Sequence, residues 1–361
     1  MTTSEQIPHF WAVVPAGGAG TRLWPLSRAD HPKFLHDLTG AGRSLLQATH
    51  DRLAPLVADR FVVVTGAAHA RAVAAQLPHL PADAVVAEPA ARDSMAAIGL
   101  AAALLERRDP DAVMGSFAAD HVITGEAEFA RALRTAVAVA REDRLVTLGI
   151  APTFPSTAFG YIEVGAPLAG HDGAAEVAQF VEKPAAEVAE AYLATGRHRW
   201  NGGMFVVRPG VLLDLLAAEH PEFAATLRRI AAAPDRLAEL WPTLPSIAID
   251  HAVAEPAAAA GRVAVVPAAF GWDDVGDVDS LAGLVPGAGP VRVLGDDALV
   301  QALDASGLVV PGSGRMIAVL GLDDVVVVDT PDALLVTTRA RAQELKRVVT
   351  ALKDAGRTDL T

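Results

Sequence analysis

The chain has 361 residues, of which 52% are hydrophobic and 20% are charged, and its formal net charge is −13. This length exceeds the size at which one hydrophobic core usually stops growing, so we expect two domains. The absence of cysteine excludes disulfides, thiolate metal sites and cysteine nucleophiles. The excess of acidic residues argues against nucleic acid as a partner, because that affinity comes from many lysine and arginine contacts to phosphate.

Membrane-spanning and targeting segments are not expected. No stretch reaches the roughly 18 uninterrupted apolar residues that a membrane helix needs. Residues 1–9 are short and polar, and no basic segment leads into an apolar one, so they do not resemble a secretory signal. We therefore expect a cytoplasmic protein without a membrane partner.

Apolar runs that predict buried strands alternate with alanine-rich stretches of helical spacing in the first 150 residues. The predicted strands are 10–14, 61–65, 84–87, 112–114 and 145–150. The predicted helices are 44–56, 67–77, 94–107 and 126–141. This alternation indicates an α/β fold with a Rossmann-like, mostly parallel sheet and helices on both faces. Ligands of such sheets bind at the carboxyl ends of the strands.

The second half of the chain contains extended pieces, further helices and a small β unit. The extended pieces, expected to extend or cap the first sheet, are 161–164, 177–181 and 204–207. The predicted helices are 211–218, 221–231 and 247–254. After a proline- and glycine-rich linker at 286–290, a small all-β unit is predicted from 298–303, 317–320 and 325–328. The end places Leu345, Val348, Val349 and Leu352 on one face of an amphipathic helix that docks on a domain or partner subunit. We therefore expect domains at 1–285 and 291–361.

A glycine-rich loop with two nearby cations follows the first predicted strand. It contains Gly17, Gly18, Gly20, Thr21 and Arg22, and Lys33 lies a short turn away. Glycines let backbone N–H groups approach a ligand closely and form a concave anion site, so the loop is suited to a triphosphate. It is not the dinucleotide fingerprint, because Leu23 occupies the place of the third glycine, and it lacks the lysine–serine or lysine–threonine pair of a P-loop. A glycine-rich turn with two solvated cations explains the loop pattern equally well.

Glu88 follows the third predicted strand. A carboxylate there could accept hydrogen bonds from guanine N1–H and N2–H₂, which neither uracil nor thymine offers together. The alternative is a glutamate that only ends the strand before Pro89.

The glycine loop with Pro32-Lys33 closely resembles the opening motif of sugar-nucleotide pyrophosphorylases, and six further motifs follow in the order of that family. They are Phe117-Ala118-Ala119-Asp120-His121, Phe159-Gly160-Tyr161-Ile162, Phe180-Val181-Glu182-Lys183-Pro184, Trp200-Asn201-Gly202-Gly203-Met204-Phe205, Ile249-Asp250-His251-Ala252 and Trp272-Asp273-Asp274-Val275-Gly276. Together the motifs span residues 11 to about 280 and are similar to those of mannose-1-phosphate guanylyltransferases.

The resemblance implies an enzyme that transfers GMP from GTP to mannose 1-phosphate, with release of pyrophosphate. In-line attack on the α-phosphorus is helped mainly by alignment and charge neutralisation, so Arg22 and Lys33 are the implied catalytic cations. Asp120 and Asp274 are the implied ligands of Mg²⁺, which typically uses one or two carboxylates. Asp273 should point the other way if it lies on a strand. Its role and that of His121 stay open.

The resemblance also implies a sugar site and a nucleotide site. Glu182 would bind sugar hydroxyls, Lys183 the sugar phosphate, and Asn201 and the Gly160 backbone the sugar. A surface ion pair at a strand end is the alternative for the adjacent glutamate and lysine.

Residues 92–97, Arg-Asp-Ser-Met-Ala-Ala, depart from the Arg-Asn-Thr-Ala-Pro-Ala pattern usual in the guanylyltransferases, which leaves the nucleotide preference open. Arg92 and Ser94 are still assigned to substrate binding. Asp93 and Ser94 are expected to cap a helix whose N–H groups are directed at the base or ribose.

The C-terminal β unit resembles the left-handed β-helix-like tail of these enzymes, which commonly supports dimer contacts, so we expect a homodimer. No isomerase domain follows, and we expect the transferase activity alone. Two alternatives remain. The same chemistry with glucose 1-phosphate and UTP or dTTP is disfavoured by the motifs at Trp200 and Ile249. A catalytically silent sugar-nucleotide sensor is expected to have lost the cations or carboxylates that this chain retains.

Overall fold

A computed structural model of the chain describes residues 6–18 and 20–361. Ala19 of the glycine loop and residues 1–5 of the predicted N-terminal segment lie outside this part. The chain divides into two compact units. Unit 1 comprises Met1–Ala16, His50–Ala119 and Ile123–Trp272, and unit 2 comprises Gly17–Thr49, Asp120–Val122 and Asp273–Thr361.

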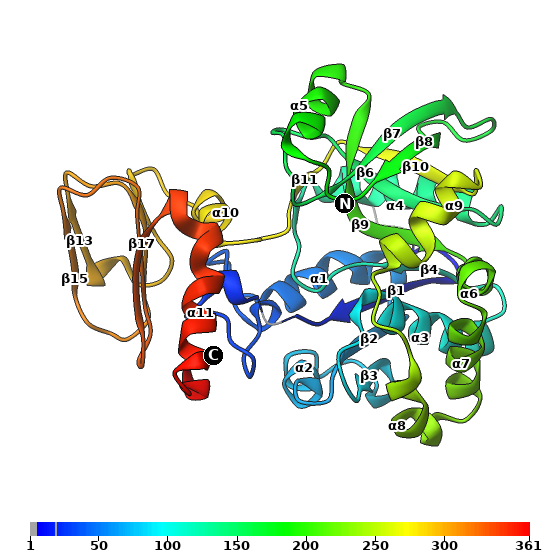
Figure 1. Cartoon of the computed structure of the whole chain (residues 1–361), viewed down its shortest axis with the longest axis horizontal. Coiled ribbons are helices and arrows are strands. Elements are labelled where there is room, and N and C mark those ends of the chain that lie inside the picture. The colour runs from blue at the N-terminus through cyan, green and yellow to red at the C-terminus, as the bar shows by residue number, and fades with distance from the viewer. Residues whose placement is uncertain (1–5, 19) are drawn as a thin grey trace. The chain divides into compact units, whose positions relative to one another are not determined.

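Unit 1 is built on a mixed sheet with the strand order β3-β2-β1-β4-β9-β6-β10-β8-β7 (Figure 1). Its strands are β1 Phe10–Ala16, β2 Phe61–Gly66, β3 Val85–Glu88, β4 Val113–Ser116, β6 Leu145–Ile150, β7 Gly160–Pro167, β8 Ala175–Val181, β9 His198–Val207 and β10 Val263–Ala268. β3, β2, β1 and β4 pair in parallel, as do β6 and β10, whereas β7, β8 and β9 pair in antiparallel fashion. The strands predicted in the first half are confirmed. Of the later extended pieces, those in β7 and β8 extend the sheet at one edge as expected, whereas β9 lies inside the sheet, between β4 and β6.

Helices cover this sheet through small apolar side chains. α3 Asp93–Arg108 contacts β1 and β2, and α6 Pro209–Glu219 and α7 Pro221–Ala232 lie beside α3 (Figure 1). α4 Glu126–Ala140 contacts β6, β9 and β10. The alanines of α3 are buried in the core of unit 1, which lets the helix approach the sheet closely. The remaining helices with residues in this unit are α1 Leu45–Val57, α2 Ala70–Gln76, α5 Ala186–Thr195, α8 Leu237–Leu240 and α9 Glu255–Ala259.

The helix predicted over 247–254 begins later than expected. The structure has a π-helical turn at Asp250–Ala254, followed by α9. The Ile249 N–H donates to the Ser94 hydroxyl at 3.0 Å, and the Met95 N–H donates to the Ile247 carbonyl at 3.2 Å. The segment before Asp250 therefore pairs with the start of α3 instead of forming a helical turn.

Unit 2 contains a small β structure with helices on one side. β12 Val291–Val293, β14 Gly307–Pro311, β16 Val325–Asp329 and β17 Leu334–Thr338 form one sheet, and β13 Val300–Leu303 pairs with β15 Ile317–Leu320. Alternate residues of β16 face opposite ways. Val325 and Val327 pack with Val319 of β15, whereas Val326 and Val328 belong to the cluster formed with the helices α10 Val278–Leu284 and α11 Leu345–Asp354. The predicted all-β unit is confirmed, although the sequence pattern missed β12, β14 and β17.

The C-terminal helix α11 docks within its own unit. Leu345 and Val349 are buried, whereas Val348 is 37% exposed, so the predicted apolar face is only partly covered. The linker at 286–290 separates α10 from β12. The domain boundary placed there stays a prediction. The short strands β5 Val122–Thr124 and β11 Gly271–Asp273 pair with each other. Within residues 6–18 and 20–361, no helix is long and apolar enough to cross a membrane.

Candidate active site

A polar cavity of about 240 Å³ in unit 2 gathers most of the residues predicted to act on phosphate and metal. Its lining is Gly17, Gly18, Gly20, Arg22, Leu23, Lys33, Asp120, His121, Asp274, Val275 and Gly276. The cavity therefore brings together three loop glycines, both predicted cations and both predicted metal carboxylates. Thr21 begins the adjacent 3₁₀ turn, Thr21–Leu23, and is not among the described residues that line the cavity.

Gly20 of the glycine loop adopts a backbone conformation that favours glycine. Gly20 has φ +57°, in the left-handed region, and an added Cβ would lie 2.8 Å from Ser27 Oγ and 3.0 Å from Lys33 Cβ. Only glycine fits there without strain. The Leu23 N–H donates to the Gly20 carbonyl at 2.9 Å, and the Leu23 side chain is fully buried. This position therefore anchors the turn in the core of unit 2, which explains why it is not a third glycine.

Lys33 is a buried cation held between the two segments that carry the predicted metal ligands. Its Nζ forms an ion pair with Asp120 Oδ2 at 2.6 Å and donates to the Asp274 backbone carbonyl at 2.6 Å. The residue is only 8% exposed, and the 3₁₀ turn Lys33–Leu35 also buries Phe34. A buried charge persists only when it is paired and hydrogen-bonded, and Lys33 meets both conditions.

The two carboxylates of the cavity fit a divalent cation. Burial raises the pKa of Asp274; Lys33 and Arg22 lower it, and the negative charges of Asp273 and Asp120 raise it further. The Asp274 carboxylate therefore lies in a desolvated place that disfavours its negative charge. Oxygen ligands from one or two carboxylates are what Mg²⁺ uses in proteins, so the donor set fits this metal.

Asp273 binds its own turn. Its Oδ1 accepts a hydrogen bond from the Val275 N–H at 2.7 Å and another from the Ser280 hydroxyl. These bonds brace the turn that leads from β11 into α10. Asp273 is not among the described residues that line the cavity, and the direction expected of its side chain stays a prediction.

A second cluster lies in unit 1 and contains the predicted sugar residues. Gly160 of β7 and Asn201 of β9 are register partners, and a Cβ at Gly160 would collide with the Glu182 carboxylate. The Lys183 Nζ donates to Glu182 Oε1 at 2.5 Å. The Glu182 side chain is 10% exposed and that of Lys183 is 62% exposed. The ion pair that was the alternative prediction is thus present, and it leaves a buried carboxylate beside a glycine and an amide.

Asn201 is fixed by a network that includes Asp250, to which the sequence pattern assigned no role. Asn201 Oδ1 accepts from the Thr147 hydroxyl at 3.0 Å and from the Gly203 N–H at 3.2 Å, and Nδ2 donates to Asp250 Oδ1 at 2.7 Å. Burial raises the pKa of Asp250 to about 6, and the charge of Glu182 adds to the rise. The signal that could have pointed to Asp250 in the sequence is its position inside the Ile249–Ala252 motif.

Glu88 is a buried carboxylate with an unused oxygen. It ends β3 and is 9% exposed, and its Oε2 has no hydrogen-bond partner among the described residues. Burial raises the pKa of Glu88 to about 7. A buried acceptor without a donor costs free energy, and a ligand donor would recover it.

The predicted helix cap is present only for Asp93, whose Oδ1 accepts a hydrogen bond from the Ser94 N–H at 2.7 Å. α3 begins at Asp93, which has φ +61°, and the residue before it makes no side-chain cap. Ser94 Oγ accepts from the Ile249 N–H, and Arg92 Nη2 donates to the Pro242 carbonyl at 2.9 Å. Both side chains therefore hold neighbouring backbone in unit 1. Their assignment to substrate binding stays a prediction.

Comparisons with known proteins agree with the motifs. Residues 11–286 match the family described as nucleotidyl transferase, and residues 299–352 match the MannoseP isomerase/GMP-like beta-helix domain. The chain is 40% identical to the xanthan biosynthesis protein XanB of Xanthomonas campestris pv. campestris (strain B100), over 97% of this chain and 74% of the relative. It is 39% identical to the mannose-1-phosphate guanylyltransferase of Escherichia coli (strain K12), over 96% of this chain and 74% of the relative.

A solved structure covers both parts of the chain. The crystal structure named mannose-1-phosphate geranyltransferase, from Thermus thermophilus, has a TM-score of 0.85 and 34% sequence identity. The alignment covers 96% of this chain and 99% of the other. The predicted fold class is thereby confirmed, with its nucleotidyltransferase domain and β-helix-like tail. The chain belongs to the mannose-1-phosphate guanylyltransferase family of nucleotidyl transferase enzymes.

Proposed function

We propose that the protein transfers GMP from GTP to mannose 1-phosphate and produces GDP-mannose and pyrophosphate. The cavity at the glycine loop carries this proposal, because it combines backbone N–H groups, two cations and two carboxylates. Its volume of about 240 Å³ is below the roughly 300–1,000 Å³ of pockets that enclose a whole small ligand. It suits phosphate groups, so we assign the base and the sugar to other residues.

The proposed reaction is a single displacement at phosphorus. An oxygen of mannose 1-phosphate forms a bond to the α-phosphorus of GTP, and the bond from that phosphorus to the bridging oxygen breaks. Pyrophosphate leaves with the electron pair. Arg22 and Lys33 stabilise the charge that develops on the leaving group. Because Lys33 is already fixed by Asp120 and the Asp274 carbonyl, little reorganisation is needed when the charge develops.

Asp120 and Asp274 would hold Mg²⁺. The bound ion would neutralise phosphate oxygens and so reduce the repulsion between the two anionic substrates. The raised pKa of Asp274 supports this assignment, because a nearby positive charge would stabilise the ionised form of its buried carboxylate.

Base and sugar selection are assigned to unit 1. The unpartnered Glu88 Oε2 complements the N1–H and N2–H₂ donors of guanine, which supports GTP over UTP or dTTP. Glu182, Asn201 and the Gly160 backbone are assigned to the mannosyl group, and Lys183 to its phosphate. The orientation of the Asn201 amide, fixed by its neighbours, supports a role in recognition.

Pyrophosphate release from purified protein with Mg²⁺ tests this proposal. Four nucleoside triphosphates are crossed with mannose, glucose and N-acetylglucosamine 1-phosphates, with Asp274→Ala and the matched variant Asp354→Ala, an exposed aspartate at the end of α11. Turnover confined to GTP with mannose 1-phosphate, lost only in Asp274→Ala, supports the proposal. Turnover with another pair keeps the mechanism and overturns the specificity. Absence of turnover with every pair, together with intact GTP binding, favours a catalytically silent sugar-nucleotide sensor.

The homodimer, the cytoplasmic location and the domain boundary between 285 and 291 stay predictions. Sedimentation of the purified protein measures its oligomeric state directly. Separate expression of residues 1–285 tests whether the larger domain folds alone.

A further inference from the structure

Within unit 2, the segment before α11 reaches the glycine loop through Gln343. This residue lies in the 3₁₀ turn Arg339–Glu344, and its Oε1 accepts a hydrogen bond from Arg22 Nη1 at 3.3 Å. Its Nε2 donates to Asp277 Oδ2. Asp277 is 7% exposed, and its other oxygen accepts from the N–H groups of Asp279 and Ser280 at the start of α10. A continuous hydrogen-bonded chain thus runs from a helix cap to the cavity arginine.

The chemistry of the two neighbours fixes the orientation of the Gln343 amide. An ionised carboxylate only accepts hydrogen bonds, and a guanidinium only donates them. The amide nitrogen must therefore face Asp277, and the amide oxygen must face Arg22. A neutral acceptor holds Arg22 without cancelling its positive charge. A carboxylate at the same position would cancel that charge.

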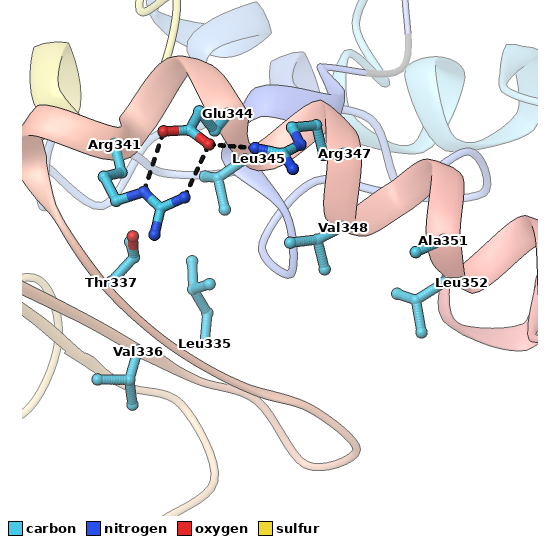
Figure 2. Close-up of a pocket in the computed structure, with 10 residues that line it drawn as sticks. All are labelled: Leu335, Val336, Thr337, Arg341, Glu344, Leu345, Arg347, Val348, Ala351 and Leu352. Carbon is cyan, nitrogen blue, oxygen red and sulfur yellow. Dashed lines mark hydrogen bonds and ion pairs between the residues drawn. The ribbon is translucent and has the colours of Figure 1, made fainter.

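The neighbouring acid, Glu344, is engaged elsewhere. It accepts from Arg341 Nη2 at 2.8 Å and from Arg347 Nη1 at 2.6 Å. Figure 2 shows Glu344 between these two arginines, in a groove that Val348 of α11 also lines. Glu344 is therefore paired with two other arginines, and the neutral side chain of Gln343 makes the contact with Arg22.

We propose that Gln343 is a positioning residue for Arg22 and holds the guanidinium at the cavity. An arginine side chain loses rotamer freedom when it is fixed in one geometry, and Gln343 imposes this loss before the substrate binds. The inference rests on the proposed role of Arg22 on the triphosphate. It makes the C-terminal segment part of the phosphate site.

Kinetics of Gln343→Ala, with Gln301→Ala as the matched exposed control on β13, test the inference. Gln343→Ala should lower kcat roughly tenfold, the usual effect of losing a hydrogen bond to a charged group. The KM for mannose 1-phosphate should stay constant. Gln343→Glu should lower kcat further, because the added carboxylate neutralises Arg22 and faces Asp277. Wild-type kcat in Gln343→Ala would overturn the inference.

A double-variant cycle separates positioning from a structural role. If Gln343 acts through Arg22, the double variant Arg22→Ala/Gln343→Ala should be no slower than Arg22→Ala alone. Additive losses would overturn the inference. Calorimetric binding of inorganic tripolyphosphate tests the same contact without catalysis, and it should be weaker in Gln343→Ala than in Gln301→Ala. Absence of turnover in the wild type would refute the proposed function, whereas equal tripolyphosphate binding by Gln343→Ala and Gln301→Ala would refute the role of Gln343.

Discussion

Replacement of Glu88 by glutamine is expected to stabilise the protein relative to the wild type, and more at alkaline pH than at acidic pH. Burial raises the pKa of Glu88 from 4.5 to about 7, so the folded protein binds this proton more tightly than the unfolded chain does. Its contribution to stability is therefore fully present below pH 4.5 and is lost as the pH rises through about 7. The whole change corresponds to about 3 kcal/mol. Neutral glutamine carries no such pH-dependent penalty.

Melting temperatures of wild type and Glu88→Gln between pH 5 and pH 8.5, followed by tryptophan fluorescence, measure this difference. Trp241 is a suitable reporter, because its indole N–H donates to the Ala90 carbonyl at 2.6 Å, two residues after Glu88. The difference between variant and wild type should grow by roughly 3 °C from the acidic to the alkaline end. Glu190→Gln, at an exposed position of α5, should show no such growth. A difference that is constant with pH would refute the raised pKa of Glu88.

The same group should make GTP binding depend on pH. Guanine donors would pair with the ionised carboxylate, so the KM for GTP should rise as the pH falls below about 7. Glu88→Gln should lack this rise and should discriminate less between GTP and UTP. Preserved discrimination in the variant would remove Glu88 from base recognition.

Three further substitutions test the two clusters. Lys33→Met leaves the Asp120 carboxylate unpaired and removes charge from the phosphate cavity, so kcat should fall by about a hundredfold or more in steady-state assays; an unchanged kcat would contradict the assignment. Gly160→Ala directs a methyl group at the Glu182 carboxylate and should raise the KM for mannose 1-phosphate while the KM for GTP stays constant; equal changes in both would argue against a sugar site. Because the pKa of Asp250 is about 6, wild-type kcat/KM for mannose 1-phosphate, measured at saturating GTP, should fall as the pH drops through that value, and Asp250→Asn should show a flat profile there; a profile that still falls in the variant would place the titration elsewhere.

Local patterns in the sequence determined much of the fold and the family. Apolar runs such as Phe61–Gly66 form strands because both faces of a parallel strand are buried, and this requirement is visible over six neighbouring residues. The glycine loop was recognisable in the sequence because its pattern also lies within a few adjacent residues. The ordered motifs identified the family, because each keeps its chemistry within a few adjacent residues.

The tertiary structure decided which of these residues meet. Lys33 and Asp274 are far apart in sequence, yet the lysine donates to that backbone carbonyl. The contact between Arg22 and Gln343 joins positions 321 residues apart, and no local pattern encodes such a distance. Ser94 was expected to cap its own helix, but its hydroxyl oxygen accepts a hydrogen bond from the Ile249 N–H instead. Local sequence fixes backbone conformation and burial, whereas hydrogen-bond partners depend on which segments the packed core brings together.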